Sequence, residues 1–509
     1  MPDTQPLPRS PRSSERSPGG LLTAGVLVVA LCLLIAVVVA KRGSAGEGGD
    51  GAAPATALPT HPNIVLILTD DQRWDELTHM PTVESQLVGK GVDFTNGFVV
   101  DPLCCPSRTT ILTGKYSHST GIYWNDPPHG GFPDFRHEEG STIATWLHAA
   151  GYRTALVGKY LNGYQPKYVG HVPPGWDVWR AMALAGRGDG KGGYYNYVMS
   201  ENGRRVRFGG APSDYSTTVL SRFATRFITS TPASQPVFLY YAPRAPHVPA
   251  TPAPRYRHAC WNLPPLRPPS YNQANVSDMP AYVRGIPRMS ARRSARIDAL
   301  HLRHCQTLLS VDDSVKAILG ALRRTGRLSD TLVVFASDNG LLLGEHRLTG
   351  KVVPYEESIR VPIVVRFDPI THFTPRVDTH LVLNLDFAET FAEAAGVSAP
   401  GAEGRSLIPL LENPDIPWRK EFLVEHWEPA NPRADDSEAM HPRPPYCAVR
   451  TTTYMYVKYS TGEQELYDVQ RDPYELHNLA HVPADRGLLR RLHAQMVKLC
   501  NPPPPGFTP

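Results

Sequence analysis

NIVLILTDDQ, residues 63–72, is the stretch that indicates the fold of this chain. It begins with a continuous apolar run, Ile64 to Leu68, and then passes at once into Asp70 and Asp71. A run of this length without alternating polar residues is typical of a strand buried on both faces, as in a parallel sheet. The stretch therefore predicts a central strand whose carboxyl end carries acidic side chains.

The same design recurs along the chain, with an apolar run followed directly by polar or ionisable residues. The other runs are RTALV (153–157) before GKYLNGY, PVFLYYA (236–242) before PRAPHVP, and TLVVFA (331–336) before SDNG. Helical patterns lie between them, for example at 141–151 and 295–326. Strands that alternate with helices predict an α/β fold with a large, mostly parallel mixed sheet sandwiched by helices.

The segment from Trp418 onward has a different pattern. The stretches EFLVEHW, YCAVRTTTYMYVKYS and QELYDV resemble strands, and residues 484–500 resemble a helix. This predicts a small antiparallel sheet packed with one helix. We therefore expect a catalytic domain over residues 61–415 and a small α+β subdomain over 416–509, with a long irregular insertion at 243–293.

The N-terminus is predicted to lie outside the fold. Residues 1–20 form a polar tail, residues 21–40 form an apolar run without a charge, and residues 41–60 form a Gly/Ala/Pro linker. As a helix, the apolar run would be about 30 Å long, enough to cross a bilayer. We predict an uncleaved signal anchor, with a cleaved signal peptide as the alternative. The catalytic domain would then be extracytoplasmic, either membrane-anchored or secreted.

Composition limits the partners and the redox state. Lys plus Arg number 52 and Asp plus Glu number 48, so the charge balance gives no indication of a nucleic-acid partner, and we expect none. An exported body would meet an oxidising compartment. Cys260, Cys305, Cys447 and Cys500 could then form two disulfides, whose connectivity the sequence leaves open.

Acidic and amide side chains follow two of the predicted strands. They are Asp70 and Asp71 after the first strand and Asp338 and Asn339 after the last. In open α/β sheets, ligands bind beyond the carboxyl ends of the strands. Three carboxylates and one amide oxygen are hard ligands that suit Ca²⁺, with Mg²⁺ as the alternative. The simpler interpretation is that the two pairs lie apart and cap helices.

Positively charged and imidazole side chains accompany them. Lys159 and His247 follow the other two strands, and Arg108 and Lys351 add further charge. A metal ion surrounded by such groups fits an anionic tetrahedral group, sulfate or phosphate. Taken singly, each cation could be a solvated surface charge, and His247 a structural loop histidine.

The pair Cys104-Cys105 precedes Pro106, which suits the first turn of a helix. We therefore place Cys104 just before a helix N-terminus, near Arg108. The helix dipole and the guanidinium would favour the thiolate there and depress the thiol pKa. The alternatives are a disulfide or a plain buried thiol.

The stretch from Cys104 through Pro106, Ser107 and Arg108 to Lys115 resembles the type I sulfatase signature C-x-P-S-R-x-x-x-L-T-G. In that family a separate formylglycine-generating enzyme oxidises the first cysteine to Cα-formylglycine. The resemblance covers residues 61 to 480 and includes the motifs TDDQ (69–72), GK (158–159), PH (246–247), SDNG (337–340), GEHR (344–347), YEESIRVP (355–362) and ELYDVQRDPYELHNL (465–479). It implies an alkaline-phosphatase-like fold.

The resemblance also implies roles for the candidate residues. Calcium would be bound by Asp70, Asp71, Asp338, Asn339 and the formylglycine at position 104. Arg108 and Lys159 would hold that formylglycine, and His247 and Lys351 would contact the sulfate and help the leaving oxygen depart. His346 would face the substrate. Many members carry a histidine two positions after the lysine, where this chain has Leu161, so the base for sulfate release is open.

The implied activity is hydrolysis of a sulfate monoester on a small molecule or glycan. One hydroxyl of the hydrated aldehyde attacks sulfur and displaces the alcohol, and loss of the proton from the second hydroxyl expels sulfate. The wording CCPSR, LTGKY and GKYLN is most similar to N-acetylglucosamine-6-sulfatases and heparan endosulfatases. Two alternatives remain: a phosphonate or phosphodiester hydrolase that uses the same groups, and a non-catalytic binder of sulfated glycans.

Overall fold

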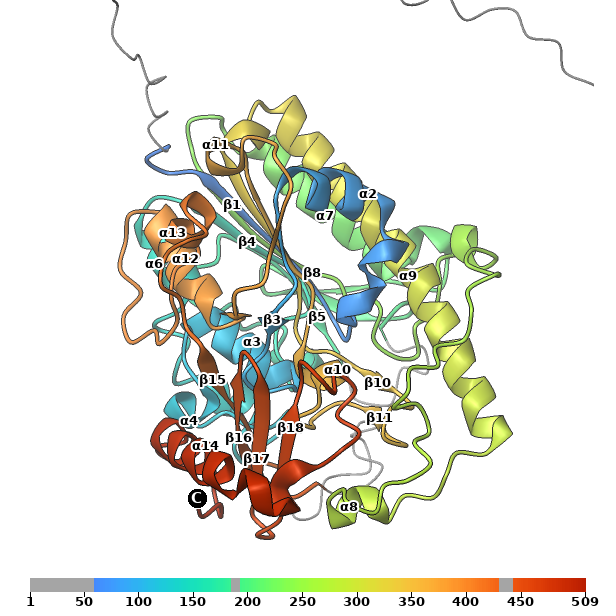
Figure 1. The fold of residues 1–509 in the computed structure, drawn as a ribbon. Coiled ribbons are helices and arrows are strands. Elements are labelled where there is room, and N and C mark those ends of the chain that lie inside the picture. Colours follow the sequence, from blue (N-terminus) through green and yellow to red (C-terminus); the bar gives the residue numbers. More distant parts are fainter. Residues whose placement is uncertain (1–58, 185–192, 430–442) are drawn as a thin grey trace, which may run out of the picture. The chain divides into compact units, whose positions relative to one another are not determined.

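The structure is a computed structural model that describes residues 59–184, 193–429 and 443–509 (Figure 1). The predicted polar tail and signal anchor, and nearly all of the predicted linker, lie outside the described residues. Within those three ranges, no helix is both long enough and apolar enough to cross a bilayer.

A ten-stranded mixed sheet forms the centre of the fold (Figure 1). Its strands lie in the order β13 (Arg376–Asp378), β2 (Val92–Phe94), β12 (Ile363–Phe367), β9 (Thr331–Ser337), β1 (Asn63–Thr69), β8 (Val237–Ala242), β4 (Arg153–Gly158), β5 (Val178–Ala183), β6 (Val198–Glu201) and β7 (Arg204–Arg207). The run from β9 to β5 is parallel, and β12, β6 and β7 run antiparallel to their neighbours. The four predicted strands are confirmed as its adjacent members β9, β1, β8 and β4.

Alternate residues of β1 supply the two halves of the core. Ile64 and Leu66 pack into the cluster that contains α3 (Cys104–Thr113), α6 (Ile143–Ala149), α12 (Asp386–Ala394) and α13 (Ile408–Glu412). Val65 and Ile67 pack on the other face against α2 (Pro81–Gln86), α7 (Ser216–Ser230) and α9 (Ala291–Arg324). Burying each such side chain contributes about 1.5–3 kcal/mol, which explains why the run is apolar on both faces.

The predicted small sheet is also confirmed. It contains β15 (Glu421–His426), β16 (Tyr446–Thr451), β17 (Tyr454–Tyr459) and β18 (Gln464–Asp468), paired antiparallel in that order. One face packs on α14 (Arg486–Leu499), to which a disulfide from Cys447 to Cys500 adds a covalent link. The other face packs against Phe98 and Leu383 of the large domain.

The region 243–293 is largely irregular, as predicted. It contains a short 3-10 helix, η6 (Pro254–Tyr256), and the four-residue helix α8 (Ala281–Arg284). A second disulfide joins Cys260 to Cys305 in α9, so the two bridges that the sequence left open are Cys260–Cys305 and Cys447–Cys500.

The remaining elements are short. They are α4 (Ser117–Thr120), α5 (Gly131–Phe135), α10 (Glu356–Ile359) and α11 (Asp368–Thr371); the pairs β3 (Gly97–Phe98) with β14 (Val382–Leu383) and β10 (Leu342–Leu343) with β11 (Thr349–Gly350); and the 3-10 helices η1 (Trp74–His79), η2 (Val88–Lys90), η3 (Pro166–Tyr168), η5 (Pro212–Asp214), η7 (Leu328–Asp330), η8 (Leu479–His481) and η9 (Pro483–Asp485).

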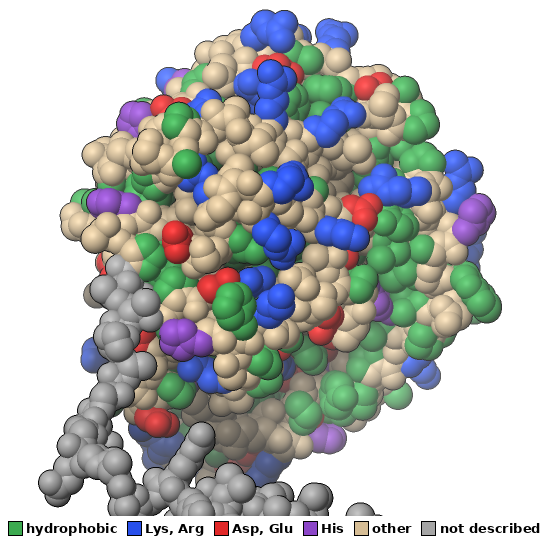
Figure 2. All heavy atoms as spheres, turned by 90° about the horizontal axis from the view of Figure 1, so that it is seen from above, with side chains coloured by type: hydrophobic (Ala, Val, Ile, Leu, Met, Phe, Trp, Pro, Cys, Tyr) green, Lys and Arg blue, Asp and Glu red, His purple; other side chains and the backbone are tan. Residues whose placement is uncertain are grey.

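On the face seen from above, Lys and Arg side chains are scattered among acidic and apolar ones (Figure 2).

Candidate active site

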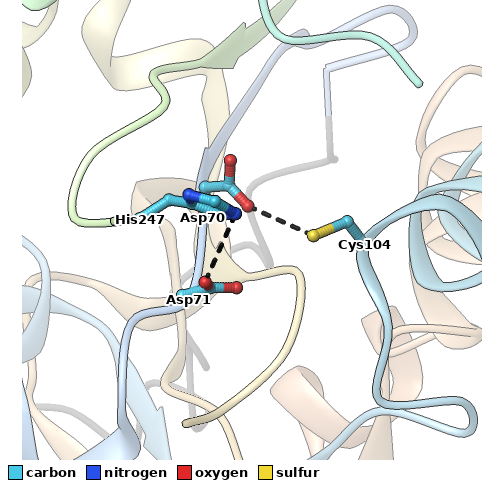
Figure 3. Close-up of side chains that lie close together, drawn as sticks. All are labelled: Asp70, Asp71, Cys104 and His247. Atoms are coloured by element: carbon cyan, nitrogen blue, oxygen red, sulfur yellow. Dashed lines mark hydrogen bonds and ion pairs between the residues drawn. The ribbon is translucent and has the colours of Figure 1, made fainter. Parts of the chain in front are cut away.

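The carboxyl ends of the four central strands bring the predicted residues together. Asp70 and Asp71 follow β1, Asp338 and Asn339 follow β9, Lys159 follows β4, and His247 lies in the loop after β8. Cys104 and Arg108 come from α3, and Lys351 directly follows β11. All of these side chains are buried. One ligand atom from each of Asp70, Asp71, Cys104 and His247 lies within 4.8 Å of the others, as Figure 3 shows.

Cys104 occupies the first turn of α3 as its first residue, one position further into the helix than predicted. Its Sγ accepts a hydrogen bond from Lys351 Nζ at 2.8 Å and lies 3.5 Å from Asp70 Oδ1. Neither Cys104 nor Cys105 is in a disulfide.

The predicted depression of the Cys104 pKa is wrong for the thiol. Burial raises its pKa well above the ordinary value, and this effect outweighs the opposing influence of Lys159 and Lys351. The carboxylates of Asp338 and Asp70 act in the same direction as burial. A helix terminus and nearby cations therefore do not make a reactive thiolate when the sulfur has no contact with solvent.

Asp70 is held by Lys159, whose Nζ donates to Oδ1 and Oδ2 at 2.8 Å each. Burial alone would raise the pKa of Asp70. Lys159, His247 and Arg108 outweigh that effect and hold it well below its usual range. Asp70 is therefore an anion that is already surrounded by positive charge.

Arg108 connects two of the strand ends. Its Nε donates to Asp338 Oδ2 at 2.8 Å and its Nη1 donates to the Lys159 carbonyl at 3.0 Å. Burial and the neighbouring charge of Asp70 raise the pKa of Asp338, and Arg108 offsets only part of that. The Nη2 of Arg108 has no hydrogen-bond partner among the described residues.

Asn339 supports the predicted cation site. Its Nδ2 donates to Asp71 Oδ1 at 2.7 Å, which leaves Oδ1 buried without a hydrogen-bond partner in the described part of the chain. Asp71 Oδ1 also accepts from Lys351 Nζ. An orphaned amide oxygen beside three carboxylates is the kind of donor set that a hard divalent cation satisfies.

His247 is oriented by the backbone. Its Nδ1 lies 2.8 Å from the Val248 carbonyl and 3.2 Å from Arg244 Nη2, and its Nε2 lies 3.7 Å from Asp71 Oδ2. Tyr194 donates its hydroxyl hydrogen to the His247 carbonyl at 2.7 Å and thereby steadies the loop.

His346, predicted to face the substrate, is fully buried, and that role stays a prediction. It lies in a second cluster of buried side chains with Glu357 and Glu475, and its ring stacks on Tyr355. Burial lowers its pKa to about 3. The sequence analysis did not single out the two glutamates, although both lie in motifs that it quoted, YEES and DPYE.

Two family models match the chain. Residues 62–397 match the family model described as sulfatase, and residues 344–501 match the one described as N-sulphoglucosamine sulphohydrolase, C-terminal. An extracellular sulfatase Sulf-1 homolog of Caenorhabditis elegans is 36% identical over 382 residues, a match that covers 71% of this chain and 52% of that protein. The chain thus spans about half the length of that relative.

Two further comparisons cover most of both chains. The N-acetylglucosamine-6-sulfatase of Homo sapiens is 31% identical over 476 residues, which is 86% of this chain and 84% of that protein. A solved structure in complex with its substrate D-glucosamine-2-N,6-O-disulfate has a TM-score of 0.72 at 23% identity and covers 87% of this chain and 98% of that one. At that identity the likeness concerns the fold, which confirms the predicted fold class.

Proposed function

The chain belongs to the sulfatase family, whose model matches residues 62–397, and we propose that it hydrolyses sulfate monoesters through a formylglycine at position 104 and a divalent cation. The observation that carries the proposal is the set of groups around Cys104. Its sulfur lies within 4.8 Å of ligand atoms of Asp70, Asp71 and His247, and 2.8 Å from Lys351 Nζ.

The charges of the site support an anionic substrate. Arg108, Lys159 and Lys351 balance the carboxylates of Asp70, Asp71 and Asp338. A divalent cation added to this balanced set makes the pocket positive, and a buried positive pocket attracts a sulfate ester strongly. Asp70, Asp71, Asp338 and Asn339 would hold that cation, with Ca²⁺ expected from an all-oxygen set of side chains. When bound, the cation would polarise the sulfate group.

Each remaining residue has a place in the proposed reaction. Oxidised to formylglycine and hydrated, residue 104 supplies one hydroxyl whose oxygen attacks sulfur and becomes the ester oxygen of a covalent sulfate. The second hydroxyl then loses its proton, which breaks the carbon–oxygen bond to that sulfate and restores the aldehyde. Lys351 Nζ, which contacts the side chain of residue 104, holds the attacking oxygen. Arg108 Nη2, which makes no hydrogen bond among the described residues and lies 3.9 Å from Asp70 Oδ1, donates to a sulfate oxygen. Lys159 fixes Asp70, and His247 Nε2 gives a proton to the oxygen of the departing alcohol.

The base for sulfate release follows from the same proton balance. Leu161, at the position where many members carry a histidine, is buried in the apolar core and has no proton to exchange. Having protonated the alcohol, His247 is neutral and can accept the proton that leaves residue 104 as sulfate departs. We therefore give both proton transfers to His247.

For the substrate we propose the 6-O-sulfate of a glucosamine residue in a glycan. The name of the human relative, N-acetylglucosamine-6-sulfatase, at 31% identity over most of both chains supports this choice. An extracytoplasmic location is proposed on the name of the worm relative, an extracellular sulfatase homolog.

The test combines mass spectrometry with a matched pair of variants. Protein from its native host is digested with trypsin and the peptide Gly91–Arg108 is weighed, which should show an aldehyde at position 104 and an intact Cys105. Cys104→Ala should lose at least about 10³-fold in kcat on N-acetylglucosamine-6-sulfate, whereas Cys105→Ala should stay within about threefold of the unchanged protein. Equal activity of the two variants would contradict the proposal.

The same assay separates the rival functions. A phosphonate or phosphodiester hydrolase would turn over phenylphosphonate esters faster than the sulfated sugar. A non-catalytic glycan binder would retain sulfated oligosaccharide without releasing sulfate, even when residue 104 is oxidised.

A further inference from the structure

His346, Glu357 and Glu475 form a second cluster of potential metal ligands, apart from the groups assigned to the reaction. His346 lies between β10 and β11, Glu357 lies in α10, and Glu475 lies between β18 and η8. One ligand atom from each lies within 4.8 Å of the other two. His346 and Glu475 have no exposed surface, and Glu357 is 8% exposed.

In each of the three side chains, one polar atom takes part in a hydrogen bond, and another has no hydrogen-bond partner among the described residues. Gln273 Oε1 lies 3.0 Å from His346 Nδ1, Ser270 Oγ donates to Glu357 Oε1 at 3.4 Å, and the Glu356 N–H donates to Glu475 Oε2 at 3.0 Å. The atoms left without a hydrogen-bond partner among the described residues are His346 Nε2, Glu357 Oε2 and Glu475 Oε1. Unpartnered buried polar atoms are rare in folded proteins, because each one lowers stability.

The hydrogen bonds also decide which of these atoms are acceptors. Gln273 Nε2 donates to the Leu476 carbonyl at 3.4 Å, so Gln273 presents its oxygen to His346. His346 Nδ1 therefore carries the hydrogen, and Nε2 has a free lone pair. The lone pair of Nε2 and one oxygen of each carboxylate are thus acceptors without a donor, in a cluster whose ligand atoms lie within 4.8 Å of one another, and a cation or added protons would satisfy them.

The local charge favours a divalent cation. The nearby guanidinium groups are paired with other carboxylates, Arg73 with Glu345 at 2.9 Å and Arg450 with Glu356 at 2.7 Å. When ionised, Glu357 and Glu475 would add two negative charges, which Arg73 and Arg450 offset only in part. In the absence of a cation, burial and the charge of Glu345 raise the pKa of Glu357 to about 8, and burial raises the pKa of Glu475 well above its ordinary value.

We propose that His346 Nε2, Glu357 Oε2 and Glu475 Oε1 bind a divalent transition-metal ion of the zinc class. One imidazole nitrogen and two carboxylate oxygens form a common zinc donor set, with bonds of about 2.0–2.2 Å. Calcium is disfavoured because it takes about 6–8 oxygen ligands. The hydrogen bond from His346 Nδ1 to Gln273 Oε1 is the outer contact that typically orients a zinc-binding histidine.

The proposed ion would have a structural role. Lys351 lies between His346 and Glu357 in the chain, and Glu475 belongs to the segment that follows the small sheet. The ion would therefore join the loop that presents Lys351 to the C-terminal part of the chain.

The full protein is tested in excess Ca²⁺, so that the first site stays filled with calcium. After dialysis with Zn²⁺ and removal of free metal, elemental analysis should find about one zinc per chain. Glu475→Gln and His346→Gln should each reduce zinc to below about a tenth of that value. Asp338→Asn, which alters the first site, should keep it. Near-UV circular dichroism checks that each variant is folded.

Cobalt gives an independent readout. Co²⁺ in place of zinc should give visible absorption in the unchanged protein and in Asp338→Asn, and should lose it in Glu475→Gln. Zinc that stays at the same level in folded Glu475→Gln would overturn the proposal. The proposal would also be overturned if the unchanged protein bound no zinc and showed a carboxylic-acid infrared band that disappears in Glu475→Gln. Protons would then fill the role of the ion.

Discussion

At the scale of single residues, Arg108 shows how much depends on one side chain. Each of its three guanidinium nitrogens has a different environment: Nε pairs with Asp338, Nη1 binds the Lys159 carbonyl, and Nη2 lies 3.9 Å from Asp70 Oδ1 without a hydrogen bond among the described residues. The planar fork of arginine permits this division, and the single ammonium of lysine does not.

Arg108→Lys should therefore lose activity although the charge is kept. One Nζ cannot reach Asp338 and the Lys159 carbonyl together, and breaking a buried ion pair costs about 3–5 kcal/mol. We expect kcat/KM for the sulfate ester to fall by at least about 10²-fold, measured by released sulfate. A value within threefold of the unchanged protein would contradict the role given to Arg108.

Glu465 makes stability depend on pH. Its carboxyl is buried and accepts hydrogen bonds from Tyr355 at 2.9 Å, Tyr467 at 2.6 Å and Tyr459. Burial raises its pKa from 4.5 to about 7, against the effect of these hydrogen bonds. The folded state keeps a proton that the unfolded chain loses, so this contribution is fully present below pH 4.5 and is lost as the pH rises through about 7.

Glu465→Gln removes this dependence. Between pH 4.5 and pH 8 the stability of the variant relative to the unchanged protein should rise by roughly 3 kcal/mol, since each pKa unit corresponds to about 1.36 kcal/mol. Urea unfolding at the two pH values measures it. A relative stability that stays constant with pH would show that Glu465 has an ordinary pKa.

The sequence predicts the candidate residues well where strand ends converge, because parallel strands bring their carboxyl ends to one edge. It does not predict burial of individual atoms. The pKa of Cys104 was therefore predicted in the wrong direction, and the grouping of His346 with Glu357 and Glu475 was not predicted.

At the scale of elements, the end of β4 depends on a glycine. Gly158 has a φ of +131°, and a Cβ built there would lie 1.9 Å from the Ala242 carbonyl oxygen of β8. The close approach lets the Lys159 N–H donate to that same oxygen at 2.8 Å. Only a residue without a side chain fits between these two strand ends.

Gly158→Ala should therefore displace Lys159 from Asp70. We expect a loss of at least about 3 kcal/mol of stability from strain and strand separation, seen as a lower melting temperature, together with loss of sulfate release. Gly151→Ala is the matched control for positive φ, because its Cβ would meet no atom within 4 Å. Equal melting temperatures for the two variants would argue against the close approach.

The disulfide between Cys447 and Cys500 links β16 to the residue that follows α14. Replacing both cysteines by serine should lower the melting temperature, since removing a native cross-link typically costs about 2–4 kcal/mol. Activity at low temperature should persist, because neither cysteine is among the residues given a role in the reaction. An unchanged melting temperature would mean that packing alone holds α14.

The central strands were predictable because each is a continuous apolar run. The strands near the two ends of the sheet were not. β7 has the sequence RRVR and is mostly exposed, and β2 is only three residues long, so neither carries a strong apolar signal. The position of these strands in the sheet is set by the strands with which they pair. Those partners are distant in sequence or form a hairpin with them, and the local sequence pattern does not reveal either arrangement.

At the scale of the whole molecule, the small sheet covers apolar surface of the large domain. Phe422 and Val424 of β15 pack in one cluster with Phe98, Leu383 and Leu385. The domain boundary predicted near residue 415 remains a prediction. Because the two parts share this apolar cluster, we expect neither part to fold fully independently of the other.

A chain that ends at residue 415 should not yield soluble protein. It would expose the apolar surface that the small sheet covers, and large exposed apolar patches promote association. Expression with size-exclusion chromatography checks this. A monodisperse fragment with the same near-UV spectrum would show that residues 61–415 fold by themselves.

Burial of Cys104 also has a consequence in time. The folded chain encloses its sulfur completely, beneath Lys351, which lies 247 residues later in the chain. A ribosome adds about 5–20 residues per second, so Lys351 follows roughly 12–50 s after Cys104. An enzyme that oxidises Cys104, as proposed, would therefore have a limited time, opened by synthesis and closed by folding. A chain that folds before it is oxidised would keep the thiol.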